Sequence, residues 1–227
     1  MQNPPCGAFF SNLRGLLYKR DNLGYNMDNT QVYENIKKGI LLTMNLEERK
    51  KTSEVIFDGK VLHVRLDTVS LPNGADATRE YVHHVGAVAV LPLTDEGEVI
   101  LEKQFRYPFH EVLVEIPAGK LDSPAEDPRK AALRELREET GAVPDELIYL
   151  GDYYGSPAIL DERLRLYLAR GLTFVEQDTD EDEFLEVFRM PLDELVREIL
   201  EGNIPDGKTQ VAALRVAAML AKEGETK

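Results

Sequence analysis

Alternating apolar and polar positions predict a series of short strands from residue 55 onward. Residues 55–71 alternate on both sides of Asp58-Gly59, which predicts a β-hairpin. Further apolar stretches of strand length lie at residues 79–83, 85–93, 98–105, 112–117, 148–154, 163–169 and 184–190. Helices are predicted at 128–140, 192–201 and 209–221. Since no internal repeat or low-complexity linker interrupts this series, we expect one mixed α/β domain.

The segment 128–140 is the strongest helix prediction. Asp127 is a suitable N-cap, and Pro128 fits the first helical position. Gly141 can close the helix in the left-handed conformation. We therefore expect a helix with both ends defined by the sequence.

Three glutamates lie on one face of this predicted helix. Glu135, Glu138 and Glu139 are spaced i, i+3 and i+4, which places them within about a quarter-turn. Like charges at this spacing repel by roughly a few tenths of a kcal/mol per pair, so the arrangement favours a bound cation. Oxygen ligands suit a hard divalent ion such as Mg²⁺ or Mn²⁺, and Arg134 could orient one carboxylate through a bidentate pair. A solvated acidic helix face is the alternative, because the chain has 41 Asp and Glu residues.

Charge and cysteine content narrow the class of protein. The formal net charge of −14 disfavours a general role in binding nucleic acid or anionic membrane surfaces. The single cysteine, Cys6, excludes an internal disulfide framework and fits a reducing compartment. No apolar run approaches the roughly 20 residues of a membrane span, and no secretory signal pattern is seen. We expect a soluble, cytoplasmic globular protein.

The first 43 residues differ in composition from the rest of the chain. They contain six of the nine asparagines and carry a net charge of +2, against −16 for residues 44–227. They are either a short N-terminal extension or, as we favour, an upstream artefact that precedes a true start at Met44. N-terminal sequencing of protein made from its own gene distinguishes the two. We expect the folded domain to span 44–227.

The residues around the carboxylate helix resemble the signature of the Nudix hydrolase family. That signature has the form G-x5-E-x7-R-E-U-x-E-E-x-G-U, where U is apolar, and Glu126 to Ala142 match every fixed position. One departure is that six residues, not five, separate Gly119 from Glu126; we place the insertion in the turn at 123–125. The resemblance implies a Nudix fold, an α/β/α sandwich with a mixed central sheet. It also implies an N-terminal antiparallel β region, residues 44–84, that mediates a homodimer.

The flanking segments resemble the ADP-ribose pyrophosphatase subfamily. They are residues 103–106, 116–120 and 156–157, with Pro157 lying 16 residues beyond Gly141. A departure follows Pro157, where Ala158 and Leu160 are larger than the family's usual residues and could narrow the substrate loop. The resemblance implies metal-dependent hydrolysis of ADP-ribose to AMP and ribose 5-phosphate. Another nucleoside diphosphate sugar is the alternative substrate, and a non-catalytic Nudix ligand sensor is the alternative of a different class.

The resemblance also implies roles for individual residues. The implied metal ligands, for Mg²⁺ or Mn²⁺, are Glu135, Glu138, Glu139 and the backbone carbonyl of Ala118. The implied catalytic residues are Glu139 and the loop glutamates Glu181 and Glu183, one of which supplies the base. The implied substrate contacts are Arg106, which binds phosphate oxygens, together with Arg79, Glu115 and Pro157. Phe57 and Tyr81 are candidate aromatic partners for the adenine.

Two further motifs are better explained by structure than by function. Residues 202–209 fit the phosphate-loop pattern G-x4-G-K-[ST], but that loop must follow a strand, and this segment follows a predicted helix. We therefore expect Gly202 to cap that helix and Thr209 to lie near the start of the next. His83 and His84 are adjacent on a predicted strand and point to opposite faces, so we do not expect them to share a metal.

Overall fold

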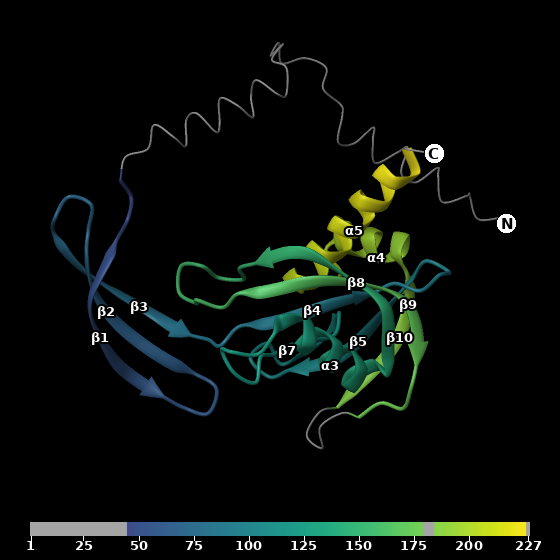
Figure 1. Cartoon of the computed structure of the whole chain (residues 1–227), viewed down its shortest axis with the longest axis horizontal. Helices are drawn as coiled ribbons and strands as arrows, with labels where there is room; N and C mark the ends of the chain where they lie inside the picture. Colours follow the sequence, from purple (N-terminus) through teal and green to yellow (C-terminus); the bar gives the residue numbers. More distant parts are fainter. Residues whose placement is uncertain (1–44, 179–183, 226–227) are drawn as a thin grey trace, which may run out of the picture. The chain divides into compact units, whose positions relative to one another are not determined.

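The structure, a computed structural model, describes residues 45–178 and 184–225 (Figure 1). These residues divide into two compact units, with the boundary between Val82 and His83. The segment 1–43 and the loop glutamates Glu181 and Glu183 lie outside the described residues. The predictions made for them therefore stay predictions.

The N-terminal unit is a three-stranded sheet of order β1-β2-β3. Its strands are β1 (Arg49–Asp58), β2 (His63–Ser70) and β3 (Asp76–His83). The antiparallel pairing of β1 with β2 confirms the hairpin predicted around Asp58-Gly59. The turn after β2 depends on Gly74, whose φ of 86° is in the left-handed region that favours glycine.

The C-terminal unit contains two sheets. A four-stranded sheet has the order β7-β4-β9-β8, and a three-stranded antiparallel sheet has the order β10-β5-β6. The strands are β4 (Ala87–Pro92), β5 (Glu98–Arg106), β6 (Glu111–Glu115), β7 (Ala118–Lys120), β8 (Ala142–Tyr153), β9 (Leu164–Phe174) and β10 (Leu185–Pro191). The first sheet is mixed, because β4 and β9 are parallel whereas its other pairs are antiparallel.

Helices cover both faces of the mixed sheet. They are α3 (Pro128–Thr140), α4 (Leu192–Glu201) and α5 (Gly207–Glu225). α3 packs against β4, β7 and β8, whereas α5 packs against β4, β8 and β9, and Figure 1 shows these two helices on opposite sides of the sheet. Every residue of β4 is buried, as expected for a strand covered on both faces. The predicted α/β/α sandwich with a mixed central sheet is confirmed.

The predicted ends of α3 are confirmed. The Asp127 side chain accepts a hydrogen bond from the backbone N–H of Arg129 at 2.9 Å, and Pro128 occupies the first turn. Gly141 has φ 70°, and its N–H donates to the Arg137 carbonyl at 2.8 Å. Leu136 is fully buried between the caps, and burial of such a side chain contributes about 1.5–3 kcal/mol. The caps and this apolar face hold the helix on the mixed sheet.

Strand β7 is the element that the apolar pattern did not predict. It has three residues, too few for an alternating pattern, and its neighbour β4 supplies the pairing that makes it a strand. Four other elements begin two or more residues earlier than predicted, namely β1 at Arg49, β3 at Asp76, β8 at Ala142 and α5 at Gly207. The extra length of β8 comes from its pairing with β9, which sequence periodicity does not report.

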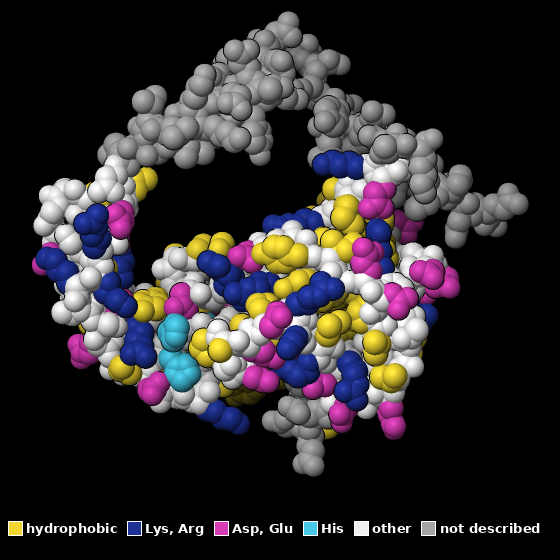
Figure 2. Space-filling model, in the orientation of Figure 1, with side chains coloured by type: hydrophobic (Ala, Val, Ile, Leu, Met, Phe, Trp, Pro, Cys, Tyr) yellow, Lys and Arg dark blue, Asp and Glu magenta, His cyan; other side chains and the backbone are white. Residues whose placement is uncertain are grey.

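Charged side chains of both signs are interspersed on the face shown in Figure 2. Although the net charge is −14, this face therefore does not form one continuous acidic surface. Across residues 45–178 and 184–225, no helix has both the length and the apolar character needed to cross a membrane.

Candidate active site

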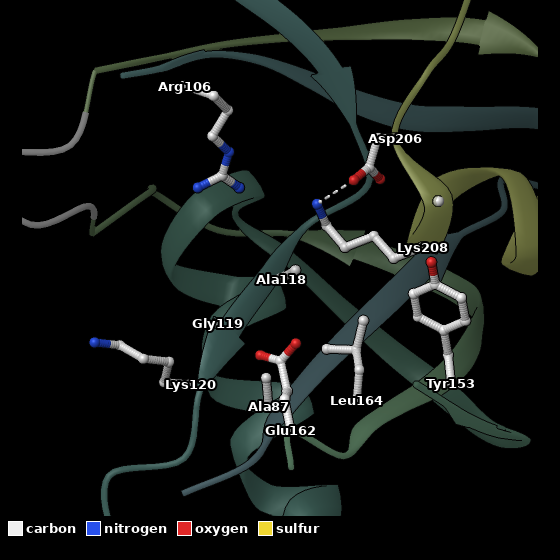
Figure 3. Close-up of a pocket in the computed structure, with 11 residues that line it drawn as sticks. Ala87, Arg106, Ala118, Gly119, Lys120, Tyr153, Glu162, Leu164, Asp206 and Lys208 are labelled. Atoms are coloured by element: carbon white, nitrogen blue, oxygen red, sulfur yellow. Dashed lines mark hydrogen bonds and ion pairs between the residues drawn. The ribbon is translucent and has the colours of Figure 1, made fainter. Parts of the chain in front are cut away.

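A cavity of about 300 Å³ lies in the C-terminal unit beside β7 (Figure 3). Two residues predicted for the site, Arg106 and Ala118, line it. Charged side chains of both signs also line it, namely Lys120, Glu162, Asp206 and Lys208, together with the ring of Tyr153. Figure 3 shows the charged ends of Arg106 and Lys208 directed toward the same part of the cavity. The cavity thus offers both cationic donors and carboxylate acceptors to a ligand.

Arg106 and Glu115, predicted separately, form a bidentate ion pair. Nε and Nη2 of Arg106 donate to the two carboxylate oxygens of Glu115 at 2.7 and 2.6 Å. The register of β5 with β6 explains the approach, because the pairs Glu102–Glu115 and Arg106–Glu111 place both side chains on one face of the sheet. A parallel fork of this kind fixes the guanidinium plane as well as its position.

The environment of Glu115 keeps it ionised. Its side chain is 1 % exposed, and this burial by itself would raise its pKa. Hydrogen bonds and charge from Arg106 and Lys208 outweigh the burial and hold the pKa of Glu115 below its ordinary value. The same pairing raises the pKa of Arg106, chiefly through its hydrogen bonds to Glu115. Both groups therefore carry charge at neutral pH.

The segment 202–209 confirms the structural interpretation of its phosphate-loop pattern. Gly202 ends α4 with φ 86°, and its N–H donates to the Ile199 carbonyl at 3.1 Å. Thr209 lies in the first turn of α5. Asp206 and Lys208 line the cavity, although neither was predicted as a site residue. The Gly-Lys-Thr triplet was the signal, but its partners come from strands far away in the sequence.

Two of the three helix glutamates contact the strand β7. Oε2 of Glu139 accepts a hydrogen bond from the backbone N–H of Ala118 at 3.0 Å, and the Glu139 side chain is buried. The carboxylate of Glu135 occupies the space that a Cβ on Gly119 would need. Glycine at residue 119 therefore lets α3 approach β7 with an acidic side chain between them.

Arg134 neutralises part of the acidic face of α3. Its Nη1 contacts Oε1 of Glu135 at 2.8 Å and Oε2 of Glu138 at 3.1 Å. One nitrogen thus bridges two carboxylates, and the predicted bidentate pair of Arg134 with a single carboxylate is not formed. Burial opposes the charge of Arg134, but the surrounding carboxylates outweigh it and raise its pKa well above the ordinary value. The face is an ion-paired network rather than a row of solvated carboxylates.

The donor set of α3 and β7 fits a hard divalent cation. Its side-chain donors are carboxylate oxygens, and the backbone of Ala118 lies next to Glu139. The close approach of Glu135 to Gly119 forms a cradle that a Cβ would fill. In the part of the chain that the structure describes, no three His, Cys, Asp or Glu side chains are already gathered as a metal cage. The fit therefore lies in donor chemistry and placement on one helix face.

The insertion before Glu126 forms a closed turn. The Glu126 N–H donates to the Ser123 carbonyl at 3.1 Å, and its carboxylate accepts from the Asp122 N–H at 2.6 Å. The same carboxylate lies 3.5 Å from Nε of Arg134. The extra residue is thus absorbed in the loop, and α3 still begins at Pro128.

Arg79, Phe57 and Tyr81 belong to the N-terminal unit. Nε of Arg79 donates to Glu48 at 2.8 Å, and this hydrogen bond raises the pKa of Arg79. The ring of Phe57 is exposed and packs close to Gly59. Their predicted substrate contacts stay predictions.

Pro157 and the two histidines lie in the C-terminal unit. The turn that contains Pro157 is closed by hydrogen bonds from the Ile159 and Leu160 N–H groups to the Ser156 carbonyl, at 3.1 and 2.9 Å. His83 lies 2.7 Å from Asp161, whereas Nδ1 of His84 lies 3.5 Å from Glu162. The histidines thus pair with different carboxylates.

Two family profiles match the chain. The NUDIX domain profile matches residues 82–211, and the profile described as the nucleoside diphosphate sugar hydrolase N-terminal domain matches residues 48–82. The boundary between the profiles coincides with that between the two structural units.

Relatives of known name cover most of the chain. An ADP-ribose pyrophosphatase of Bacillus subtilis is 44% identical over 74% of this chain and 91% of its own length. A methanol dehydrogenase activator of Bacillus methanolicus is 44% identical over 73% of this chain and 90% of its own length. The crystal structure of an ADP compounds hydrolase superposes with a TM-score of 0.69, at 22% identity, over 80% of this chain and 99% of that one.

Proposed function

The chain belongs to the Nudix hydrolase family, and on this premise we propose that it hydrolyses ADP-ribose to AMP and ribose 5-phosphate. The observation that carries the proposal is that the carboxylate helix α3 contacts the strand β7, which lines the same cavity as Arg106. The relative named ADP-ribose pyrophosphatase, with its high coverage, supports the choice of substrate.

We propose Mg²⁺ as the metal, with Mn²⁺ as the alternative. Glu135, Glu138, Glu139 and the Ala118 carbonyl would hold it. When bound, the ion neutralises diphosphate charge and lowers the pKa of a coordinated water. Hydrolysis adds the water oxygen to one phosphorus and breaks the P–O bond to the bridging oxygen.

Arg106 is the proposed phosphate-binding side chain. Its planar fork is already oriented by Glu115, at 2.7 and 2.6 Å, and it lines the cavity. A preorganised cation of this kind loses less side-chain entropy when it binds the diphosphate. Glu115 acts through Arg106 in this proposal, so a direct substrate contact is not required of it. Glu181 or Glu183 accepts a proton from the attacking water.

The N-terminal unit is the proposed dimerisation surface and adenine-binding region. Val55, Ile56 and Phe57 on β1 are each at least half exposed, which leaves apolar side chains of this strand open to a partner. We propose that a second copy of the chain covers them, while Phe57, Tyr81 and Arg79 contribute to adenine binding. We also propose a cytoplasmic enzyme without a nucleic-acid or membrane partner.

Product analysis tests the function. The chain is incubated with ADP-ribose, ADP-glucose, GDP-mannose and NADH, each with and without Mg²⁺. We expect AMP and ribose 5-phosphate to form fastest from ADP-ribose, and only with metal. Faster turnover of another nucleoside diphosphate sugar would leave the proposed reaction unchanged but would show a different substrate specificity. Ala158 and Leu160 would then be the first residues to substitute. Binding of ADP-ribose without turnover of any substrate would favour a ligand sensor.

A further inference from the structure

The buried carboxylate of Glu115 is shared by two cations. Arg106 donates to both of its oxygens, and Nζ of Lys208 also contacts Oε2. The side chains differ in depth, because Lys208 is 11 % exposed and Arg106 is 38 % exposed. Both cations line the cavity, but the lysine is the more buried of the two and the arginine the more open to a ligand.

The start of α5 fixes Lys208 in this position. Asp206 accepts hydrogen bonds from Nζ of Lys208 at 3.1 Å and from the backbone N–H of Thr209 at 2.9 Å. The buried Thr209 hydroxyl donates to Asp206 at 2.6 Å and accepts from the Ile116 N–H at 2.9 Å. Because Ile116 directly follows Glu115, Thr209 aligns α5 with the end of β6. That alignment brings Lys208 to Glu115.

Packing against Tyr153 explains why the residue before Lys208 is a glycine, Gly207. A Cβ on Gly207 would collide with the hydroxyl of Tyr153, which lines the cavity. Figure 3 shows the Tyr153 ring beside the segment that carries Lys208. Each member of the Gly-Lys-Thr triplet thus has a contact that places α5 against the site.

We infer that Lys208 is a positioning residue that acts on substrate binding through Glu115 and Arg106. The inference rests on the proposed function, in which Arg106 binds the diphosphate. Arg106 commits its Nε and Nη2 edge to Glu115, so its Nη1 edge is the one available to a cavity ligand. Lys208 satisfies part of the Glu115 charge, and the arginine consequently keeps positive potential for an anionic ligand. Charge differences of this kind act strongly where water is largely excluded.

Asp206 moderates this effect without removing it. It is 16 % exposed, and its carboxylate also binds the hydroxyl and N–H of Thr209 at the beginning of α5. Part of the negative charge of Asp206 is therefore balanced by the positive end of the α5 helix dipole. Removal of the Lys208 charge leaves Arg106 as the cation opposite Glu115, and the attraction of the arginine for a diphosphate falls.

The test compares K208M, K208R and wild type as full chains with Mg²⁺ and ADP-ribose. For K208M we expect KM to rise about tenfold while kcat changes less than about twofold, because the lysine affects diphosphate binding. The inhibition constant of adenosine, which lacks the diphosphate, should not change. In K208R, KM should return close to the wild-type value. K222M, on the same helix, should have the KM and kcat of wild type.

A double-mutant cycle separates positioning from general damage to the fold. In the E115Q background, K208M should raise KM less than about twofold further, because its route of action has already been removed. An equal rise in both backgrounds would overturn the inference, as would a loss of kcat at constant KM or weaker adenosine inhibition. Wild type that does not hydrolyse ADP-ribose would instead refute the proposed function. The same series would then be run on the nucleoside diphosphate sugar that the chain does hydrolyse.

Discussion

The carboxylate of Glu135 lies against the backbone of Gly119, in the space that a Cβ at residue 119 would occupy. A side chain at residue 119 would therefore require the Glu135 carboxylate to move from this position. The contact connects two parts of the family signature that are separated in sequence by the turn before α3. It explains physically why a glycine is needed so far from the helix that carries the acidic residues.

Substitution of Gly119 by alanine should reduce activity more than stability. The added methyl group must displace Glu135 or β7, and misplacement of a catalytic group by about 1 Å can cost about 100-fold in rate. We expect kcat to fall by about that factor and the Mg²⁺ concentration for half-maximal activity to rise. Thermal unfolding and steady-state kinetics measure the two effects. G224A is the control, because a Cβ there has no neighbour within 4 Å; equal activity of G119A and G224A would contradict the prediction.

Replacement of Glu139 by glutamine should abolish turnover while leaving the fold intact. The glutamine carbonyl can still accept the hydrogen bond from the Ala118 N–H, now 3.0 Å from Glu139 Oε2. The negative charge that a divalent ion needs is lost, and we expect kcat/KM to fall by at least about 100-fold. Circular dichroism should show an unchanged melting curve within a few degrees. Full activity with Mg²⁺ in E139Q would show that Glu139 is not a metal ligand.

The sequence predicted α3 well because its boundaries depend on local chemistry. Asp127 and Gly141 act on their own backbone neighbours, so their effects can be read from a few adjacent residues. The three helix glutamates could be placed on one face for the same reason. The contacts of Glu135 and Glu139 with β7 could not be predicted, because a three-residue strand has too few positions to show a period.

The contacts of Arg106, Glu115 and Lys208 could be predicted only in part. Arg106 and Glu115 were identified through resemblance, but their pairing depends on the register of two strands. Lys208 reaches Glu115 across 93 positions of sequence, and its local pattern suggested only a phosphate loop. Excluding that loop was correct. The partner of the lysine required the three-dimensional arrangement of α5 and β6.

Substitution of Arg106 by lysine should weaken substrate binding although the charge is retained. Lysine cannot reproduce the two parallel hydrogen bonds to Glu115, at 2.7 and 2.6 Å, while also facing a diphosphate. Loss of one charged hydrogen bond costs about 1.5–3 kcal/mol, or roughly 10- to 100-fold in KM. Steady-state kinetics with ADP-ribose measures the change. R197K, on the exposed face of α4, is the matched control, and an unchanged KM in R106K would exclude Arg106 from substrate binding.

Glu115 should make the free energy of unfolding depend on pH in the acidic range. Its pKa in the folded protein is below its ordinary value of 4.5, because Arg106 and Lys208 outweigh the effect of burial. Its contribution to stability is therefore present above pH 4.5 and is lost as pH falls through the folded-state pKa.

The E115Q variant provides the comparison for that pH dependence. At neutral pH it should be less stable than wild type by about 3 kcal/mol, since one partner of a buried ion pair is neutralised. The difference should narrow as the pH falls below 4.5, where wild type loses the same charge. Urea unfolding at a series of pH values measures it, with E186Q as the control for an exposed carboxylate. A stability difference that stays constant from pH 7 to pH 3 would show that Glu115 is not the group whose protonation destabilises the fold.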